Sequence, residues 1–558
     1  MVEFGPRLPG EAAHHAFCDW LEDEFVDAGL QLLPCDEYVY PDRWAPQRVA
    51  LEIVGASKLG PLPVAFPVVR SAPTGPNGIT APLALPGADV AGKIVVVDLP
   101  EPAKATAGIF VPMASYLHWP GHTVADWAQM DYTRAWIMQI PGDEIAAGAA
   151  AVVFIADNAS YEAMKGTFTP HQAAKGKVTK LVVDRDTGAA LRTAALAGAH
   201  ARLTLDATTG PGVYRNVTAV LPGESDETII VHTHSDGQNA IEENGCVALV
   251  HYARHFGSLP PGRRLKRTLV LAAWSAHMTD PAHYTEADGW AASHRDLVER
   301  AVGAVAIEHL GCTEWLDDST KGYVGTGENE IYGIWTTQGP TQALAQKALI
   351  KADLYRHLLL KPPVQITVGA AFHTYGVPHV SGIAGPTYLL KVSKSGEIEK
   401  MNFELAAKQT SFYADVIHAF DAADRNALRQ GDPTLGGTPI PTDVKSKKVT
   451  CGPADRVVAP AGHGRRLMLR FYGRRHLNRG VLVTLAAPDA ALSDVSIELR
   501  RGKTLYARER LAKVDRKVRQ VVLRRRGGKK FPAGSYRLVV RGQGKVLLSR
   551  TVHVGKAG

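Results

Sequence analysis

The chain has 558 residues, of which 45% are hydrophobic and 21% are charged, and its formal net charge is +8. This length exceeds what one hydrophobic core supports, so we expect about three domains. The sequence has no apolar run long enough to span a bilayer and only five cysteines, which argues against a helical membrane protein and against a small disulfide scaffold.

The N-terminal part predicts a helix over residues 11–30, with an apolar face made by Phe17, Trp20, Leu21 and Phe25. The residues before it contain no hydrophobic signal region, so the chain as written is expected to be cytoplasmic, or secreted if a signal was removed. Cys18 and Cys35 are the one pair considered for a disulfide, but free buried thiols fit this composition better.

The stretch from about residue 76 to 207 consists of short β-rich runs separated by Gly and Pro. Strands are predicted within 92–100, 149–157 and 179–207, and a helix separates two strands in the last of these ranges. Since no concentrated polar cluster accompanies them, we predict that residues 76–207 form a self-contained insert. The insert would follow an N-terminal part of the main domain at residues 1–75.

Strands and helices alternate between residues 208 and 425, which we assign to the main domain. The predicted strands lie at 228–233, 267–274 and 302–308, and the predicted helices at 245–256, 287–300, 340–354 and 402–420. Such alternation favours an α/β fold with a mostly parallel sheet covered by helices.

Residues 426–455 are rich in Pro, Gly, Thr and Lys and predict a linker. The remaining residues, 456–558, contain short alternating strands that predict a small antiparallel β-sandwich. Much of the net charge lies here, including the run from Arg524 to Lys530. A solvated surface is the simpler interpretation. If this domain binds a partner, an anionic polymer or a cell-surface contact fits better than specific nucleic acid, since no recognition motif is present.

Polar side chains gather where the predicted strands of the main domain end. They are His232, His234, Asp236, Glu242, Glu243 and Glu308. Imidazoles and carboxylates at the junctions of strands and helices are how open α/β sheets build ligand and metal sites. Two adjacent acids such as Glu242 and Glu243 would need a cation to offset their charges if they were buried. The sequence therefore points to a metal site at this edge of the sheet.

This arrangement resembles the M28 family of zinc exopeptidases, and the insert looks like the protease-associated (PA) domain that often interrupts these enzymes. The resemblance implies that His234, from a His-x-Asp motif, is a metal ligand and that Asp236 orients the loop or a ligand behind it. It implies that the metal-bridging acid is Glu242 or, with a one-residue shift, Glu243. Glu308 matches the family's third-strand ligand.

The resemblance also implies what the chain has lost. His277 stands where the family has its general-base Glu, Met278 replaces the second Glu, and Gly369 falls on the last histidine ligand. Neither methionine nor glycine suits a hard or borderline cation. We therefore expect a mononuclear centre with one divalent metal, zinc being the foremost candidate.

Several residues are candidates for chemistry beside this metal. His277 has the residue type of a general base, with an unperturbed pKa of about 6.5, or it becomes a fourth ligand. His309 and Glu314 are candidates for closing the site or binding the substrate. The candidate catalytic residues are thus His277, Asp236 and His309, and the candidate substrate-binding residues are His232, Glu314, His373 and His379.

We predict metal-dependent hydrolysis of an amide, peptide or related bond in a small-molecule or peptide substrate. Ordinary aminopeptidase activity is not expected, because two ions normally hold the free amine and the carbonyl oxygen. The rival hypotheses are a non-catalytic binding protein on a decayed exopeptidase fold, and a non-peptidase reaction such as that of a lyase at the same site. The dense histidines and acids at the strand ends favour an enzyme. No serine nucleophile elbow and no phosphate-binding loop is present in the sequence.

Overall fold

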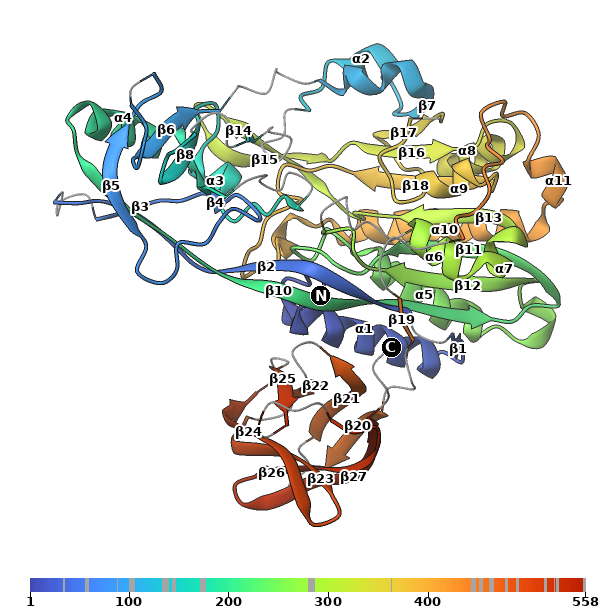
Figure 1. Cartoon of the computed structure of the whole chain (residues 1–558). Coiled ribbons are helices and arrows are strands. Elements are labelled where there is room, and N and C mark those ends of the chain that lie inside the picture. Colours follow the sequence, from blue (N-terminus) through green and yellow to red (C-terminus); the bar gives the residue numbers. More distant parts are fainter. Residues whose placement is uncertain are drawn as a thin grey trace.

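The computed structural model describes residues 1–33, 36–55, 60–87, 89–99, 106–132, 140–142, 147–170, 177–279, 287–362, 364–442, 448–450, 455–460, 466–476, 480–487, 491–515, 519–525, 527 and 531–554. Within them lie an α/β domain, a smaller α/β unit inserted into it and a C-terminal β-sandwich (Figure 1). No helix in these ranges combines the length and the apolar character needed to cross a membrane.

The central sheet has a parallel middle and antiparallel flanks. In spatial order its strands are β10 (His200–Leu221), β12 (Arg267–Trp274), β11 (Ser225–His234), β13 (Ala301–Ile307), β18 (His379–Ala384), β16 (Tyr332–Thr336), β17 (His357–Leu360) and β7 (Ala114–His118). The strands from β12 to β18 run parallel, whereas β10, β16 and β7 pair antiparallel with a neighbour. The sheet is thus mixed, and its predicted parallel character holds for the centre.

Helices cover both faces of this sheet, as predicted. One face packs against α1 (Ala12–Asp27), α5 (Gly245–Gly257), α8 (Pro340–Ala352) and α10 (Phe403–Ala422), which share the largest hydrophobic core. The other face packs against α6 (Ala287–Ser293), α7 (Arg295–Glu299) and α9 (Ala370–Thr374). The helix predicted over 287–300 is therefore two helices, which meet at the non-helical backbone of His294.

A long antiparallel ribbon joins the main sheet to the inserted unit. It consists of β2 (Asp36–Ile53) and β10, and it runs across the whole width of the α/β part in Figure 1. At one end β10 pairs with β12 of the main sheet, and at the other it pairs with β5 (Ile79–Ala84) of the insert. The edge strand β1 (Gln31–Leu32) also pairs with β10.

The inserted unit has its own sheet and its own cores. Its sheet contains β5, β6 (Ile94–Asp98), β8 (Ala151–Ala156), β9 (Thr179–Asp184) and β4 (Phe66–Pro67), with hydrophobic clusters on both faces and α4 (Arg185–Leu196) against one of them. Its smaller elements are β3 (Pro61–Leu62) and α3 (Tyr161–Met164). The short helices η2 (Ala107–Met113) and α2 (Val124–Ala128) follow β6 in the chain, and η1 (Val2–Phe4) packs against α1 at the N-terminus. Residues 106–132 lie against the main sheet rather than the insert, because β7 extends β17 and Phe110 and Trp127 share a core with Trp335.

The C-terminal part is the predicted antiparallel β-sandwich. One sheet contains β20 (Asp455–Pro460), β21 (Arg466–His476), β22 (Gly480–Ala486) and β25 (Arg519–Arg524). The other contains β24 (Thr504–Val514), β23 (Leu492–Arg501), β26 (Gly534–Gly542) and β27 (Lys545–Val554). Side chains from both sheets form one separate core. Figure 1 shows this domain beside α1.

The segment before the sandwich contacts the main domain over part of its length. After α11 (Arg425–Leu428), Asp432 accepts a hydrogen bond from the backbone N–H of Gln338, and Ile440 is buried in the core beside α9. The short strand β19 (Lys448–Thr450) pairs with β2. The predicted domain limits stay predictions.

The remaining elements of the main domain are short. They are η6 (Pro261–Arg263), the hairpin of β14 (Thr313–Asp318) and β15 (Gly322–Asn329), and η8 (Ile398–Lys400). Cys18, Cys246 and Cys312 are buried free thiols, and Cys35, the suggested partner of Cys18, lies outside the described residues.

Candidate metal centre

Three neighbouring strands of the central sheet end at one place. His234 is the last residue of β11, Glu308 directly follows β13, and His277 lies just beyond the end of β12. The loop between β11 and α5 adds Asp236 and Glu242. Because the carboxyl ends of parallel strands share one edge of a sheet, residues far apart in sequence converge there.

Four buried side chains, those of His234, Glu242, Glu308 and His309, each bring one polar atom to this edge of the sheet. The Nε2 atom of His234 lies 3.8 Å from Oε2 of Glu308, and Nε2 of His309 lies 3.5 Å from Oε2 of Glu242. The ligand atoms of His234, Glu308 and His309 are all within 4.8 Å of one another. None of these four atoms has a hydrogen-bond partner in the described part of the chain. Buried polar atoms without partners are costly, so this group fits a bound cation.

Hydrogen bonds at the far side of each imidazole fix which nitrogen faces the group. Nδ1 of His234 donates to the backbone oxygen of Asp236 at 2.8 Å, and Nδ1 of His309 donates to the backbone oxygen of Ala384 at 2.6 Å. Since a carbonyl oxygen only accepts, both hydrogens sit on Nδ1 and both Nε2 lone pairs remain for a cation. Backbone carbonyls orient metal-binding histidines in this way.

Hydrogen bonds also position the carboxylate of Glu308 and the turn that carries Glu242. Oε1 of Glu308 accepts a hydrogen bond from the backbone N–H of Val368 at 3.0 Å, which leaves Oε2 for the group. The side-chain oxygen of Asn239 accepts from the backbone N–H groups of Ile241 and Glu242 and so fixes the turn that carries Glu242. The backbone of His309 is left-handed, with φ 55°, a conformation that non-glycine residues adopt mainly where the surroundings enforce it.

Charges around His234 shift its titration. Burial and the neighbouring His277 lower its pKa, but the hydrogen bond and charge of Asp236 and the charge of Glu242 outweigh them, so the pKa of His234 is raised. Burial raises the pKa of Asp236, yet the contact with His234 leaves it below its usual value. The charges of Asp236 and Glu242 thus favour a positive charge at His234.

His277 borders this group and is partly open to solvent. Its ring lies 4.3 Å from the ring of His234, and one of its nitrogens belongs to a second cluster with His234 and Glu242 whose ligand atoms are within 4.8 Å. The preceding residue, Ala276, has φ 82°, so a strained turn sets the direction of His277. Both predicted roles, proton acceptor and extra ligand, are compatible with this position.

The structure separates the two acids that the sequence left as alternatives. Glu243 forms a buried ion pair with Arg7, whose guanidinium also donates to the backbone oxygen of Asn239. A single β-bridge between Arg7 and Gly237 closes this contact. Glu242 is therefore the acid beside the histidines, and Arg7 fixes the loop that carries it. Sequence analysis missed Arg7, because its partner lies 236 residues away.

Neither of the two positions that the resemblance assigns to second-metal ligands, Met278 and Gly369, offers a ligand in the structure. Gly369 has no room for a side chain, since a Cβ atom there would lie 2.0 Å from Oγ of Ser381 and 3.1 Å from Cβ of Ala306. Met278 donates its backbone N–H to Asp236 at 2.6 Å, and its sulfur accepts a hydrogen bond from Gln238. Both positions hold the site together without offering a ligand for a second ion.

The other predicted substrate-binding residues lie elsewhere. The ring of His232 stacks between Trp274 and Phe372, with centroid distances of 4.3 and 4.8 Å. His373 and His379 contact each other on that same side of the sheet. Burial lowers the pKa of His379 to about 3 and that of His232 well below its usual value.

Glu314 also lies outside the group. Its carboxylate forms an ion pair with Arg356 at 2.9 Å and accepts a hydrogen bond from Thr326 within the β14–β15 hairpin.

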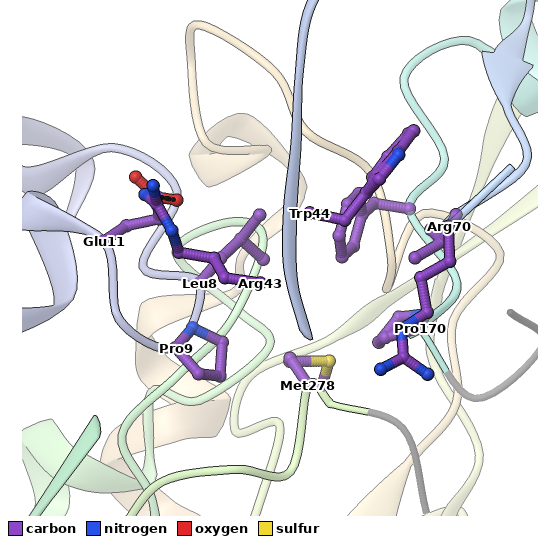
Figure 2. A pocket seen from close by; sticks show the side chains of 10 residues that line it. Leu8, Pro9, Glu11, Arg43, Trp44, Arg70, Pro170 and Met278 are labelled. Atoms are coloured by element: carbon purple, nitrogen blue, oxygen red, sulfur yellow. Dashed lines mark hydrogen bonds and ion pairs between the residues drawn. The ribbon is translucent and has the colours of Figure 1, made fainter. Parts of the chain in front are cut away.

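A hollow between the main domain and the insert adjoins the centre (Figure 2). It is a shallow hollow that is open to solvent, with about 340 Å³ of space when the open solvent at its mouth is included. Met278 lies at its base, next in sequence to His277. Its walls are apolar except for three charged side chains, Glu11, Arg43 and Arg70, of which Glu11 and Arg43 form an ion pair at 2.7 Å. The lining of the hollow is therefore mainly apolar, with the Glu11–Arg43 ion pair and Arg70 as its charged members.

The comparisons with known proteins concern the fold. No protein-family model and no curated protein sequence matches the chain. The structure of a peptidase M28 precursor from Shewanella amazonensis SB2B aligns with 79% of this chain and 93% of its own, with 15% sequence identity and a TM-score of 0.52. An aminopeptidase from Aneurinibacillus sp. strain AM-1 aligns over 79% and 94% of the two chains, with 17% identity and a TM-score of 0.47. The similarity to the first structure shows that the chain has a divergent form of the M28 peptidase fold.

Proposed function

We propose that the chain is a metal-dependent hydrolase that cleaves an amide, peptide or related bond at a mononuclear centre. The observation that carries this proposal is the group of four buried atoms without partners on His234, Glu242, Glu308 and His309. Two imidazoles and two carboxylates form a donor set that zinc binds readily. The peptidase fold supports the hydrolytic assignment.

The bound cation would supply Lewis acidity and positive charge at the point where a scissile carbonyl comes to lie. The residues of this chain supply the rest. His277, whose ring lies beside that of His234 and is partly open to solvent, would accept a proton from water and return it to the leaving group. Asp236 positions the imidazole of His234 and the backbone of Met278 rather than contacting substrate.

The closed positions at Gly369 and Met278 support one ion rather than two. A two-ion aminopeptidase holds the free amine of its substrate near the second ion. Among the described residues that line the hollow beside His277, the one carboxylate, Glu11, is paired with Arg43 and so is not available to bind a free amine. The apolar walls instead suit a substrate that has no free amine and carries an apolar group near the scissile bond.

The test begins with elemental analysis of protein purified without chelators. We expect about one equivalent of a divalent metal in the wild type, and less than a tenth of that in Glu308→Gln and in His309→Gln. His251→Gln and Glu404→Gln change the same residue types at exposed positions and serve as matched controls. Two equivalents in the wild type would contradict the mononuclear assignment.

Hydrolysis is then measured on matched substrates. We expect turnover of N-acetyl-L-phenylalanine, which has no free amine, to exceed that of phenylalanine anilide, which has one, and to disappear in Glu308→Gln. Metal binding without turnover of any amide substrate would favour a non-peptidase reaction. Absence of both would favour the binding-protein hypothesis.

A further inference from the structure

The C-terminal sandwich carries a charge opposite to that of the rest of the chain. Residues 456–558 contain 26 Lys and Arg but only 5 Asp and Glu, whereas residues 1–455 contain 37 Lys and Arg and 50 Asp and Glu. Such an excess on a small domain attracts anions and raises their local concentration. The modest net charge of the whole chain conceals this division.

Five arginines lie on the outer face of one sheet of this domain. Backbone pairing places Arg500 directly opposite Arg537, and it places Arg510 and Arg541 on either side of Ser496. Residues paired directly across antiparallel strands point to the same side of the sheet. The alternate residues of these strands fill the core between the two sheets, so this set points outward. We call it the arginine face: Arg500, Arg508, Arg510, Arg537 and Arg541.

One acid partly neutralises the arginine face. Glu498 lies opposite Arg508 and forms ion pairs with Arg508 and with Arg500, the latter at 2.7 Å. Among the described residues no acid pairs with Arg510, Arg537 or Arg541. Like charges directly opposite each other destabilise a sheet, so the pairing of Arg500 with Arg537 costs stability in the free protein. A bound polyanion would remove that cost.

We propose that the arginine face binds a linear polysaccharide that carries carboxylate or sulfate groups. Strands lie roughly 4.8 Å apart and same-face residues of one strand roughly 7 Å apart, so the guanidinium groups repeat at short intervals over a flat surface. The planar fork of arginine suits carboxylate and sulfate groups. Two hydroxyls, those of Ser496 and Thr551, are paired directly with these arginines, and that of Ser549 accepts a hydrogen bond from Nε of Arg537 at 2.8 Å. Such hydroxyls beside guanidinium groups suit the hydroxyls of a sugar chain.

The same face is less suited to nucleic acid. Proteins that bind single strands stack bases on aromatic side chains, and none of the residues paired directly with the arginine face is aromatic. The described residues of this domain contain no helix to enter a major groove. Duplex DNA and anionic membranes therefore serve as competing probes.

Binding is measured on the full chain with four fluorescent or immobilised probes: alginate for carboxylates, heparin for sulfates, a 24-base-pair duplex, and vesicles of phosphatidylglycerol and phosphatidylcholine. We expect alginate or heparin to bind more tightly than the duplex and the vesicles, with an affinity that falls steeply as salt rises. Which of the two glycans binds better distinguishes the two acid groups.

The decisive variant is Arg510→Gln/Arg537→Gln/Arg541→Gln, whose control, Arg48→Gln/Arg263→Gln/Arg264→Gln, removes the same charge from exposed sites of the other domains. We expect the first variant to bind the preferred glycan at least tenfold more weakly, with a salt dependence reduced by about one contact for each arginine removed. The control should bind like the wild type. An unchanged melting temperature of the sandwich, or a raised one, shows that the first variant is folded.

Three results would overturn the proposal: equal glycan binding by the two triple variants, tighter binding of duplex or vesicles than of either glycan, or no glycan binding by the wild type. None of these results depends on whether the metal centre is active.

Discussion

The two adjacent acids Glu242 and Glu243 have different partners, and this difference can be tested residue by residue. Glu242→Gln removes an acid from the cation group, so we expect the metal content to fall below a tenth of the wild-type value. Glu243→Gln leaves Arg7 buried without its carboxylate, which is expected to cost about 3–5 kcal/mol of unfolding free energy. Metal analysis and urea unfolding of both variants measure the two effects. Loss of metal in Glu243→Gln but not in Glu242→Gln would reverse the assignment.

Protonation of His357, which lies outside the candidate metal centre, makes the free energy of unfolding depend on pH. Burial lowers the pKa of His357 to about 4, and the ring is held neutral because Nδ1 donates to the backbone oxygen of Tyr355 while Nε2 accepts from Gln409. The unfolded chain, with a histidine pKa of about 6.5, takes up a proton first as pH falls. The contribution of His357 is therefore complete above pH 6.5 and is lost between pH 6.5 and 4, at up to about 1.4 kcal/mol per pH unit.

Gln409→Glu isolates this contribution from those of other buried histidines. A carboxylate at position 409 accepts a hydrogen bond from protonated His357 and raises its pKa in the folded state. We therefore expect the variant to lose less stability than the wild type between pH 6.5 and 4.5, whereas Gln129→Glu at an exposed site should behave like the wild type. Urea unfolding followed by tryptophan fluorescence reports on it, since all nine tryptophans lie between residues 20 and 335. An equal loss of unfolding free energy in the wild type and in Gln409→Glu between pH 6.5 and 4.5 would contradict the prediction.

The members of the candidate site that directly follow strands could be predicted from the sequence. His234 ends β11 and Glu308 directly follows β13, and the apolar runs of the sequence predict both of these strand ends. The position of His309 depends on a left-handed backbone, and that of Arg7 on a contact across the fold. Neither is encoded in local spacing, and the choice between Glu242 and Glu243 likewise required the loop geometry.

Packing between β18 and the segment before α9 leaves no space for the last histidine ligand that the resemblance predicts at position 369. A Cβ atom on Gly369 would collide with Oγ of Ser381, so we expect Gly369→Ala to cost about 1–3 kcal/mol through overpacking. Ser381→Gly should remove most of that cost when the two changes are combined. Urea unfolding of the two single variants and the double variant measures the coupling. Gly262→Ala, where a Cβ meets nothing within 4 Å, is the control.

If the effects of Gly369→Ala and Ser381→Gly on the free energy of unfolding simply added in the double variant, this prediction would be contradicted. If Gly369→Ala were tolerated without Ser381→Gly, the segment before α9 would have space for a side chain. The loss of the last histidine ligand would then not be fixed by packing, and the argument for a single ion would rest on Met278 alone.

Local patterns predicted the elements that have a simple period. The strand predicted at 267–274 matches β12, and the helix predicted at 245–256 differs from α5 by one residue. The ribbon of β2 and β10 was missed, because β2 contains Pro41 and Pro46. Proline normally interrupts a strand, and here the register shifts beside Pro46, as expected at a bulge. Pairing between segments some 170 residues apart leaves no local signal.

At the scale of the whole molecule, the α/β body and the sandwich have separate hydrophobic cores. The candidate metal centre joins the ends of three strands and one loop of the body, and no described residue of the sandwich belongs to it. A ligand that binds only the folded state stabilises the part that contains its site. We therefore expect two thermal transitions that respond to different changes.

Removal of metal with a chelator should lower the transition of the body alone. A cation present at a hundred times its dissociation constant contributes about 2.7 kcal/mol, which corresponds to a shift of roughly 3 °C for a body of this size. Scanning calorimetry shows both transitions, and tryptophan fluorescence follows only the body. Glu308→Gln, which lacks a ligand, should be insensitive to the chelator. A chelator effect of equal size on that variant, or on the sandwich, would mean that the stabilising ion binds elsewhere in the chain.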